Sequence, residues 1–153
     1  KARELYQEAT KEDPAFGKAW NNLGLLETQS ERYHSALKHF KKAAKLDPED
    51  PIIRYNLGYV SLTLGDLENA LQFYKEAVEL KPTYTKASYA VAEILREEGE
   101  YDEAISFYRK VLDHDPEHHR SWKGMGKCFK KMGLKRQSRE CLERAEKVKS
   151  DIK

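Results

Sequence analysis

The sequence contains no hydrophobic run of the about 18 to 20 residues that a transmembrane helix needs. Its first residues, KARELYQEATKEDP, also lack the apolar segment of a secretory signal peptide. We therefore expect a soluble chain without a membrane span.

Cysteine is scarce, since Cys128 and Cys141 are the only two in the chain. Two cysteines 13 residues apart are too few and too local for a disulfide framework. We interpret them as reduced thiols that fill helix positions. This interpretation favours an intracellular, cytoplasmic protein.

Sequence motifs of catalysis are missing as well. There is no glycine-rich phosphate loop, no nucleophile elbow and no Cys-His pair in a shielded pocket. His114, His118 and His119 cluster around Pro116, but no cysteine or acidic ligand set with metal geometry accompanies them. We interpret them as polar residues of an exposed corner between helices, and predict a protein that is not an enzyme and has no cofactor or metal.

What the sequence does contain is a period of 34 residues, which separates Pro14, Pro48, Pro82 and Pro116. A fixed period of this length indicates stacked structural repeats. Between Gly17 and Pro48 the apolar spacing predicts two amphipathic helices, from about Gly17 to Ser30 and from about Tyr33 to Leu46. Neither helix can bury its apolar side alone, so each repeat needs a neighbour.

The same phase divides the whole chain. Residues 1–16 are predicted to be the second helix of a truncated repeat, followed by repeats at 17–50, 51–84 and 85–118. Residues 119–153 form the last repeat, in which Ser138 replaces an alanine and Ser150 stands where the proline is expected. Its final helix is therefore predicted to continue as a terminal cap.

The residues of one period are the basis of a family resemblance. They are Trp20, Leu23, Gly24, Ala36, Phe40, Ala43 and Pro48. This pattern resembles the tetratricopeptide repeat (TPR), and the resemblance covers essentially the whole chain. It implies an all-α right-handed superhelix (α-solenoid) of antiparallel helix pairs, whose first helices line a concave groove that binds peptides or protein segments. We therefore expect a non-catalytic scaffold.

If the first helices line such a groove, their side chains at fixed places after each repeat start should contact a partner. The candidates are Asn21, Asn22, Leu25, Tyr55, Asn56, Tyr59, Lys86, Tyr89, Glu93, Arg120, Lys123 and Lys127. Tyr55, Tyr59 and Tyr89 are not needed to build the repeat, and tyrosine is a good binding anchor. The alternative is that these rings pack on neighbouring helices.

Two asparagines, Asn22 and Asn56, share one phase of the repeat. A side-chain amide offers a donor and an acceptor that match the main chain of an extended peptide. Asparagine is also common at this phase in the family, and Ala90 and Gly124 interrupt the series. Both readings remain open.

Charge is unevenly distributed along the chain. The last 35 residues hold 12 Lys or Arg against 4 Asp or Glu, whereas the first 118 hold 16 against 22. Lys123, Lys127, Lys130 and Lys131 recur at helical spacing and form one basic face, which would attract an acidic partner. The alternative is a solvated face, as for the Lys41-Lys42 run. Nucleic acid is disfavoured, because interleaved aromatics are lacking.

Some TPR domains bind the acidic carboxyl terminus of heat-shock chaperones through two lysines, two asparagines and an arginine. Here Asn56 and Lys86 match, but Asn21, Leu25 and Ala90 stand where a lysine, an asparagine and the arginine are required. We therefore reject that partner, because the missing cations must pair with the carboxylates. Self-association and the presentation of substrates to a catalytic domain elsewhere are the alternative functions.

Overall fold

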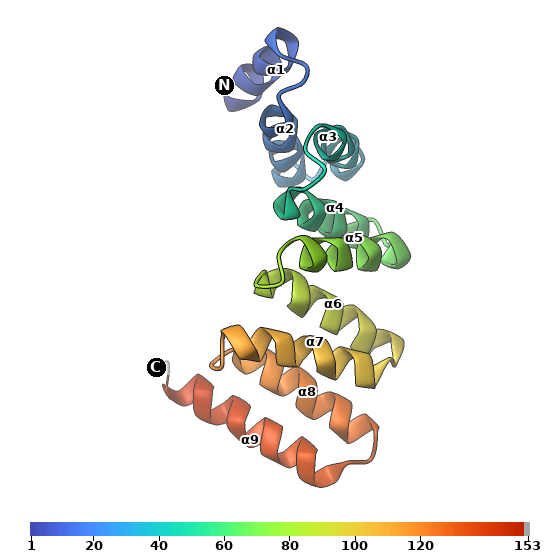
Figure 1. Ribbon diagram of the computed structural model, residues 1–153, viewed down its shortest axis with the longest axis vertical. Coiled ribbons are helices and arrows are strands. Elements are labelled where there is room, and N and C mark those ends of the chain that lie inside the picture. The colour runs from blue at the N-terminus through green and yellow to red at the C-terminus, as the bar shows by residue number, and fades with distance from the viewer. Residues whose placement is uncertain (152–153) are drawn as a thin grey trace. The chain divides into compact units, whose positions relative to one another are not determined.

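The computed structural model describes residues 1–151, which form nine helices and no strand (Figure 1). The helices are α1 (Ala2–Glu12), α2 (Gly17–Gln29), α3 (Tyr33–Leu46), α4 (Pro51–Thr63), α5 (Leu67–Leu80), α6 (Thr85–Glu98), α7 (Tyr101–His114), α8 (His119–Lys131) and α9 (Lys135–Asp151). The predicted all-α fold is confirmed, and the two helices expected after Gly17 match α2 and α3 to within one residue. Within residues 1–151, none of the helices is both long and apolar enough to span a membrane.

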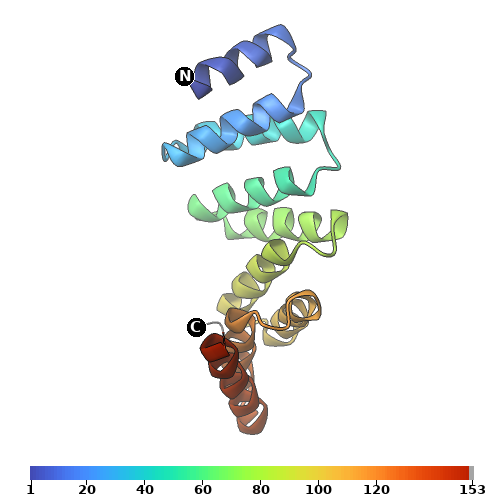
Figure 2. The same ribbon diagram turned by 90° about the vertical axis from the view of Figure 1, so that its left-hand side faces the viewer.

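The chain divides into two compact units, residues 1–81 (unit 1) and residues 82–153 (unit 2). In unit 1, α2 packs on α3 and α4 packs on α5, and Figure 2 shows these helices stacked in chain order. In unit 2, α6 packs on α7 and α8 packs on α9, while α7 also contacts α8. Apart from α1, which contacts α2, each unit is therefore built from consecutive helix pairs. The last two residues of the predicted repeat 119–153 lie outside the described residues.

The turn inside each helix pair contains one left-handed residue. Gly65, Gly99 and Gly133 have φ angles of 83°, 87° and 79° at this turn. Glu31 takes the same place in the first pair with φ 57°. Glycine adopts this conformation without steric cost, so only the first turn is strained.

Aromatic rings of the second helices fill the space that glycines of the first helices leave open. Phe40 and Tyr74 are fully buried. A Cβ built on Gly24 would lie 2.5 Å from the Phe40 ring, and one on Gly58 would lie 2.7 Å from the Tyr74 ring. The recurrence of small and large residues in the sequence thus reflects close helix packing within the pairs α2–α3 and α4–α5.

The corners between repeats are closed by a recurring hydrogen bond to proline. In three repeats, the side chain six residues after the proline donates to the carbonyl oxygen of that proline. The pairs are Trp20 with Pro14 at 2.9 Å, Arg54 with Pro48 at 3.2 Å and Trp122 with Pro116 at 2.9 Å. Ser88 occupies the same place in the remaining repeat, and its shorter side chain leaves a buried hydroxyl without a partner among the described residues.

The last helix pair accommodates the serine that replaces alanine. The Ser138 hydroxyl is buried and donates a hydrogen bond to the Gly126 carbonyl oxygen at 2.8 Å. This bond satisfies the hydroxyl at a site where the other pairs hold a methyl group. The helix α9 then continues through Ser150 to Asp151.

Candidate protein-binding surfaces

Exposed apolar side chains gather on the first helices of unit 1. Leu25 on α2 and Ile52, Tyr59 and Leu62 on α4 are 39%, 52%, 45% and 37% exposed. The helices α2 and α4 contact each other, and we name these four exposed residues the α2–α4 strip. Leu25 and Tyr59 were predicted from the sequence as groove residues, and both are accessible to a partner.

A hydrogen bond between two predicted groove asparagines joins α2 to α4. The Asn56 amide nitrogen donates to the Asn21 amide oxygen at 3.0 Å. The structure thus pairs Asn56 with Asn21, and Asn22 lies half-buried beside them. Each paired amide retains further hydrogen-bonding capacity, because an amide has two donors and two acceptor lone pairs.

The other two predicted tyrosine anchors are partly enclosed. The ring of Tyr55 is half-buried, with its centroid 5.3 Å from that of Tyr74. The ring of Tyr89 packs edge-on against His118, at a centroid distance of 5.0 Å. Burial raises the pKa of both tyrosines. Packing on neighbouring helices therefore accounts for part of their surface, and their contact with a partner stays a prediction.

In unit 2, the predicted groove residue Glu93 belongs to a hydrogen-bonded network. Its carboxylate accepts a hydrogen bond from the Tyr108 hydroxyl and another from Arg96 at 3.0 Å. Arg96 also donates to the Tyr108 oxygen at 3.2 Å and pairs with Glu97 at 2.6 Å. Burial and the bond to Glu93 raise the pKa of Tyr108, so its hydroxyl keeps its proton. Burial by itself lowers the pKa of Arg96, but its hydrogen bonds outweigh this effect and raise it.

Next to this network lies a basic pocket of roughly 670 Å³. It is lined by Arg96, Glu97, Tyr101, Lys127, Lys130 and Lys131. Arg96 is neutralised by its carboxylates, whereas no ion pair is formed by the three lysines within residues 1–151. This pocket contains the predicted contact Lys127. The other predicted cations, Lys86, Arg120 and Lys123, are exposed outside its lining.

The three clustered histidines have different surroundings. His114 is exposed at the end of α7, as predicted. His118 differs from the expected polar loop residue, because it is half-buried and caps α8 by accepting a hydrogen bond from the Ser121 backbone N–H at 3.2 Å. His119 is the first residue of α8. No group of three potential metal ligands comes together among the residues that the structure describes.

Comparisons with known proteins agree with this architecture. Two models of the tetratricopeptide repeat match residues 26–85 and 95–151, which together make up most of the chain. A crystal structure of MamA is similar with a TM-score of 0.91 and 22% identity, over 97% of this chain and 87% of that chain. MamA from Desulfovibrio magneticus RS-1 is similar with a TM-score of 0.86 and 18% identity, over 97% and 84%. YrrB, described as a TPR protein with an unusual peptide-binding site, gives a TM-score of 0.85 and 28% identity, over 97% and 77%. The curated protein sequences contain no significant match.

Proposed function

Because the chain belongs to the tetratricopeptide repeat family, we propose that it is a non-catalytic scaffold that binds a peptide or protein segment along its first helices. The similarity to YrrB supports peptide binding as the mode of action. The proposed contacts in unit 1 are the α2–α4 strip and the Asn21–Asn56 pair.

The exposure of the α2–α4 strip is the observation that carries this proposal. Apolar side chains that face water stabilise a complex when a partner covers them. Beside them, the paired amides of Asn21 and Asn56 provide donors and acceptors for a peptide main chain. A strip that combines both features suits an extended segment with apolar or aromatic side chains.

The cations of unit 2 add a preference for acidic residues. Lys123 and Lys127 are exposed, and Lys127 lines a pocket with two further unpaired lysines. Such a surface speeds the encounter with an acidic segment and orients it. We also place this function inside the cell, since Cys128 and Cys141 are both buried free thiols.

Peptide selection on the purified protein tests the proposal. Peptides selected from a displayed random library should bind wild type in calorimetry and lose at least tenfold in affinity with Tyr59→Ala. Leu67→Ala is the matched control, because Leu67 is also 45% exposed but lies on the second helix α5. Selected peptides that bind Tyr59→Ala as tightly as wild type would remove the strip from the function.

Self-association is the second candidate function. Leu5 on α1 is 60% exposed, so α1 presents an apolar side chain that a second copy could cover. Sedimentation velocity at several protein and salt concentrations distinguishes the two functions. A mass that rises with concentration and falls for Leu5→Ser would favour assembly.

A further inference from the structure

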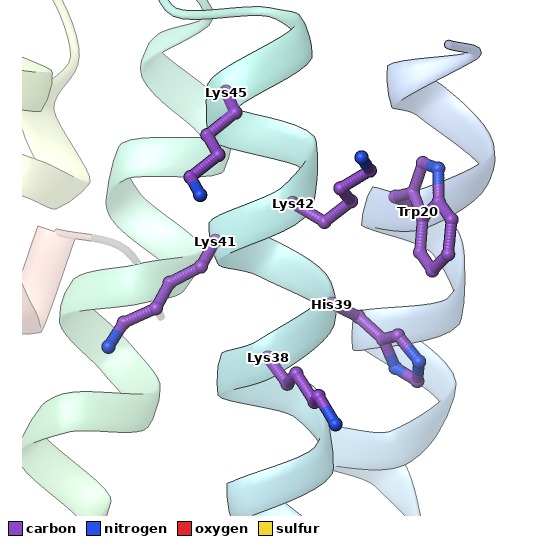
Figure 3. Close-up of a pocket in the computed structure, with 6 residues that line it drawn as sticks. All are labelled: Trp20, Lys38, His39, Lys41, Lys42 and Lys45. Atoms are coloured by element: carbon purple, nitrogen blue, oxygen red, sulfur yellow. The ribbon is translucent and has the colours of Figure 1, made fainter. Parts of the chain in front are cut away.

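A second basic pocket, of roughly 550 Å³, lies between α2 and α3 of unit 1 (Figure 3). It is lined by Trp20, Lys38, His39, Lys41, Lys42 and Lys45. Five of these residues come from the second helix α3 and one from α2. We name this site the α3 basic pocket; it shares no residue with the predicted groove.

The positive charge of the α3 basic pocket is only partly balanced by nearby acids. Hydrogen bonds from Asn69 and, less strongly, the charge of Lys41 lower the pKa of Asp66, so Asp66 is close enough to interact with Lys41. The helix α3 contains four lysines and neither aspartate nor glutamate. All four lysines are exposed, and none forms an ion pair within the part of the chain that the structure describes. The buried carboxylate of Glu27 on α2 is already paired with Arg3 at 3.0 Å and Arg32 at 3.8 Å. The pocket therefore offers Lys38, Lys42 and Lys45 to an anionic partner. Lys41 is exposed as well, but it extends away from Trp20 and also interacts with Asp66 (Figure 3).

Trp20 gives this cationic site an apolar wall of fixed orientation. Its indole N–H donates to the Pro14 carbonyl oxygen, and its ring centroid lies 5.8 Å from that of His39. The Lys42 ammonium lies 6.0 Å from the indole centroid, and Figure 3 shows Lys42 and His39 extending toward Trp20. The rest of the ring, which is half-buried, can contact an apolar side chain of a partner.

We propose that the α3 basic pocket is a second docking site, which binds an acidic protein segment carrying an apolar or aromatic side chain between its carboxylates. The carboxylates pair with Lys38, Lys42 and Lys45, and the apolar side chain contacts Trp20. The volume lies within the range of about 300 to 1,000 Å³ that is usual for small-ligand pockets, so it admits a few side chains. This site would let one chain hold two partners, or two segments of one partner.

The geometry favours a protein segment over single-stranded nucleic acid. Binding of successive bases requires a row of aromatic side chains on which they stack. Apart from His39, Trp20 is the only aromatic residue in this lining. Lys42 and His39 both lie next to its indole ring. Lysine contacts carboxylate and phosphate alike, so the test includes both chemistries.

Fluorescence anisotropy with a defined probe tests this docking site. The probe is a fluorescein-labelled peptide of glutamates around one central phenylalanine, and we expect its affinity to fall with rising salt. Replacing the four lysines of α3 by glutamine should weaken binding at least tenfold while preserving helix propensity. The control is Lys127→Gln with Lys130→Gln and Lys131→Gln, which removes the three lysines of the unit 2 pocket and should leave most binding intact.

A second readout reports on Trp20 itself. In a Trp122→Phe background Trp20 is the only tryptophan, and the probe should change its emission. Tyr59→Ala should leave this change intact, so failure of the α2–α4 strip and failure of the α3 basic pocket are distinguishable. Unchanged Trp20 emission, or equal probe affinity in the quadruple glutamine variant, would overturn the docking site.

Two further outcomes would assign the α3 basic pocket to a different ligand. An oligothymidylate that binds more tightly than the peptide, and loses affinity in the quadruple variant, would assign the pocket to nucleic acid. A self-associated wild type that becomes monomeric in the quadruple variant would assign it to a second copy of the chain. Either result overturns the acidic protein segment as the ligand.

Discussion

Gly124 of α8 lies directly against the ring of Tyr108 on α7, so that a Cβ on Gly124 would be 2.3 Å from the Tyr108 Cζ. In the pairs α2–α3 and α4–α5 the aromatic ring of the second helix meets a glycine of its own pair, but in α6–α7 the place of that glycine is taken by Ala92. The Tyr108 ring therefore packs against Gly124 of the next repeat. Its hydroxyl donates a hydrogen bond to Glu93. One glycine thus links the packing of two repeats.

The Gly124→Ala variant should lower the free energy of unfolding of unit 2 by about 1–3 kcal/mol, because the added methyl group overpacks a buried ring. Chemical denaturation followed by Trp122 fluorescence in a Trp20→Phe background measures this effect locally. Gly17→Ala in unit 1 is the control, followed by Trp20 fluorescence in a Trp122→Phe background, since its Cβ would meet neighbours at an ordinary 3.4 Å. Equal unfolding midpoints for Gly124→Ala and wild type would show that the ring moves aside freely.

The Glu31→Gly variant should stabilise unit 1 by about 1 kcal/mol. Glu31 has a φ of 57°, and a left-handed conformation costs a non-glycine residue about 1–2 kcal/mol. The greater entropy of glycine in the unfolded chain offsets part of this gain. Trp20 fluorescence in a Trp122→Phe background monitors the transition. The reverse change, Gly65→Glu, should destabilise the same unit; a stabilising effect would contradict the strain argument.

Unit 2 should lose stability as the pH falls below about 6.5. Burial lowers the pKa of His118, and His119 and Arg120 lower it further while Asp115 raises it. The unfolded chain then binds the proton first, so the free energy of unfolding decreases on acidification and is retained above this window. A single titrating histidine changes the free energy of unfolding by at most about 1.4 kcal/mol per pH unit.

Denaturation of wild type and His118→Asn between neutral and mildly acidic pH tests this dependence. Asparagine keeps the cap of α8 but does not titrate. The variant should therefore show a shallower decline with Trp122 as the probe. Parallel pH profiles for the two proteins would argue against His118 as the titrating group.

Cys128 should react slowly with iodoacetamide in the folded protein. Its side chain is fully buried, and burial raises the pKa of its thiol to about 11, so little thiolate exists at neutral pH. Mass spectrometry after a timed pulse should show rapid labelling only in denaturant. Rapid labelling without denaturant would indicate frequent local opening of α8.

The period of the prolines and the apolar spacing were sufficient to predict stacked helix pairs, because repeat packing depends on phase, whereas the superhelix was implied by the family resemblance. Gly65, Gly99 and Gly133 mark turns in the sequence, and the structure gives each a positive φ. Pairwise side-chain choices were harder to predict. Asn21 and Asn22 are adjacent in sequence, and only the exact rotation of α2 decides which of them meets Asn56.

The α3 basic pocket was missed for a different physical reason. From the sequence, Lys41 and Lys42 were interpreted as an ordinary solvated helix face. Trp20 was interpreted as a core residue of the repeat. Only the packing of α2 on α3 leaves the indole half-buried beside the ammonium groups. A helix with four lysines and no acidic residue was the signal available in the sequence.

The hydrogen bond between the side-chain amides of Asn21 and Asn56 has a consequence for any segment that binds unit 1. A bound segment must either leave this hydrogen bond intact or break it and form new hydrogen bonds with both side chains. A wholly apolar segment cannot form them, so its binding is disfavoured at this point. Discrimination of this kind requires no charge and persists in high salt.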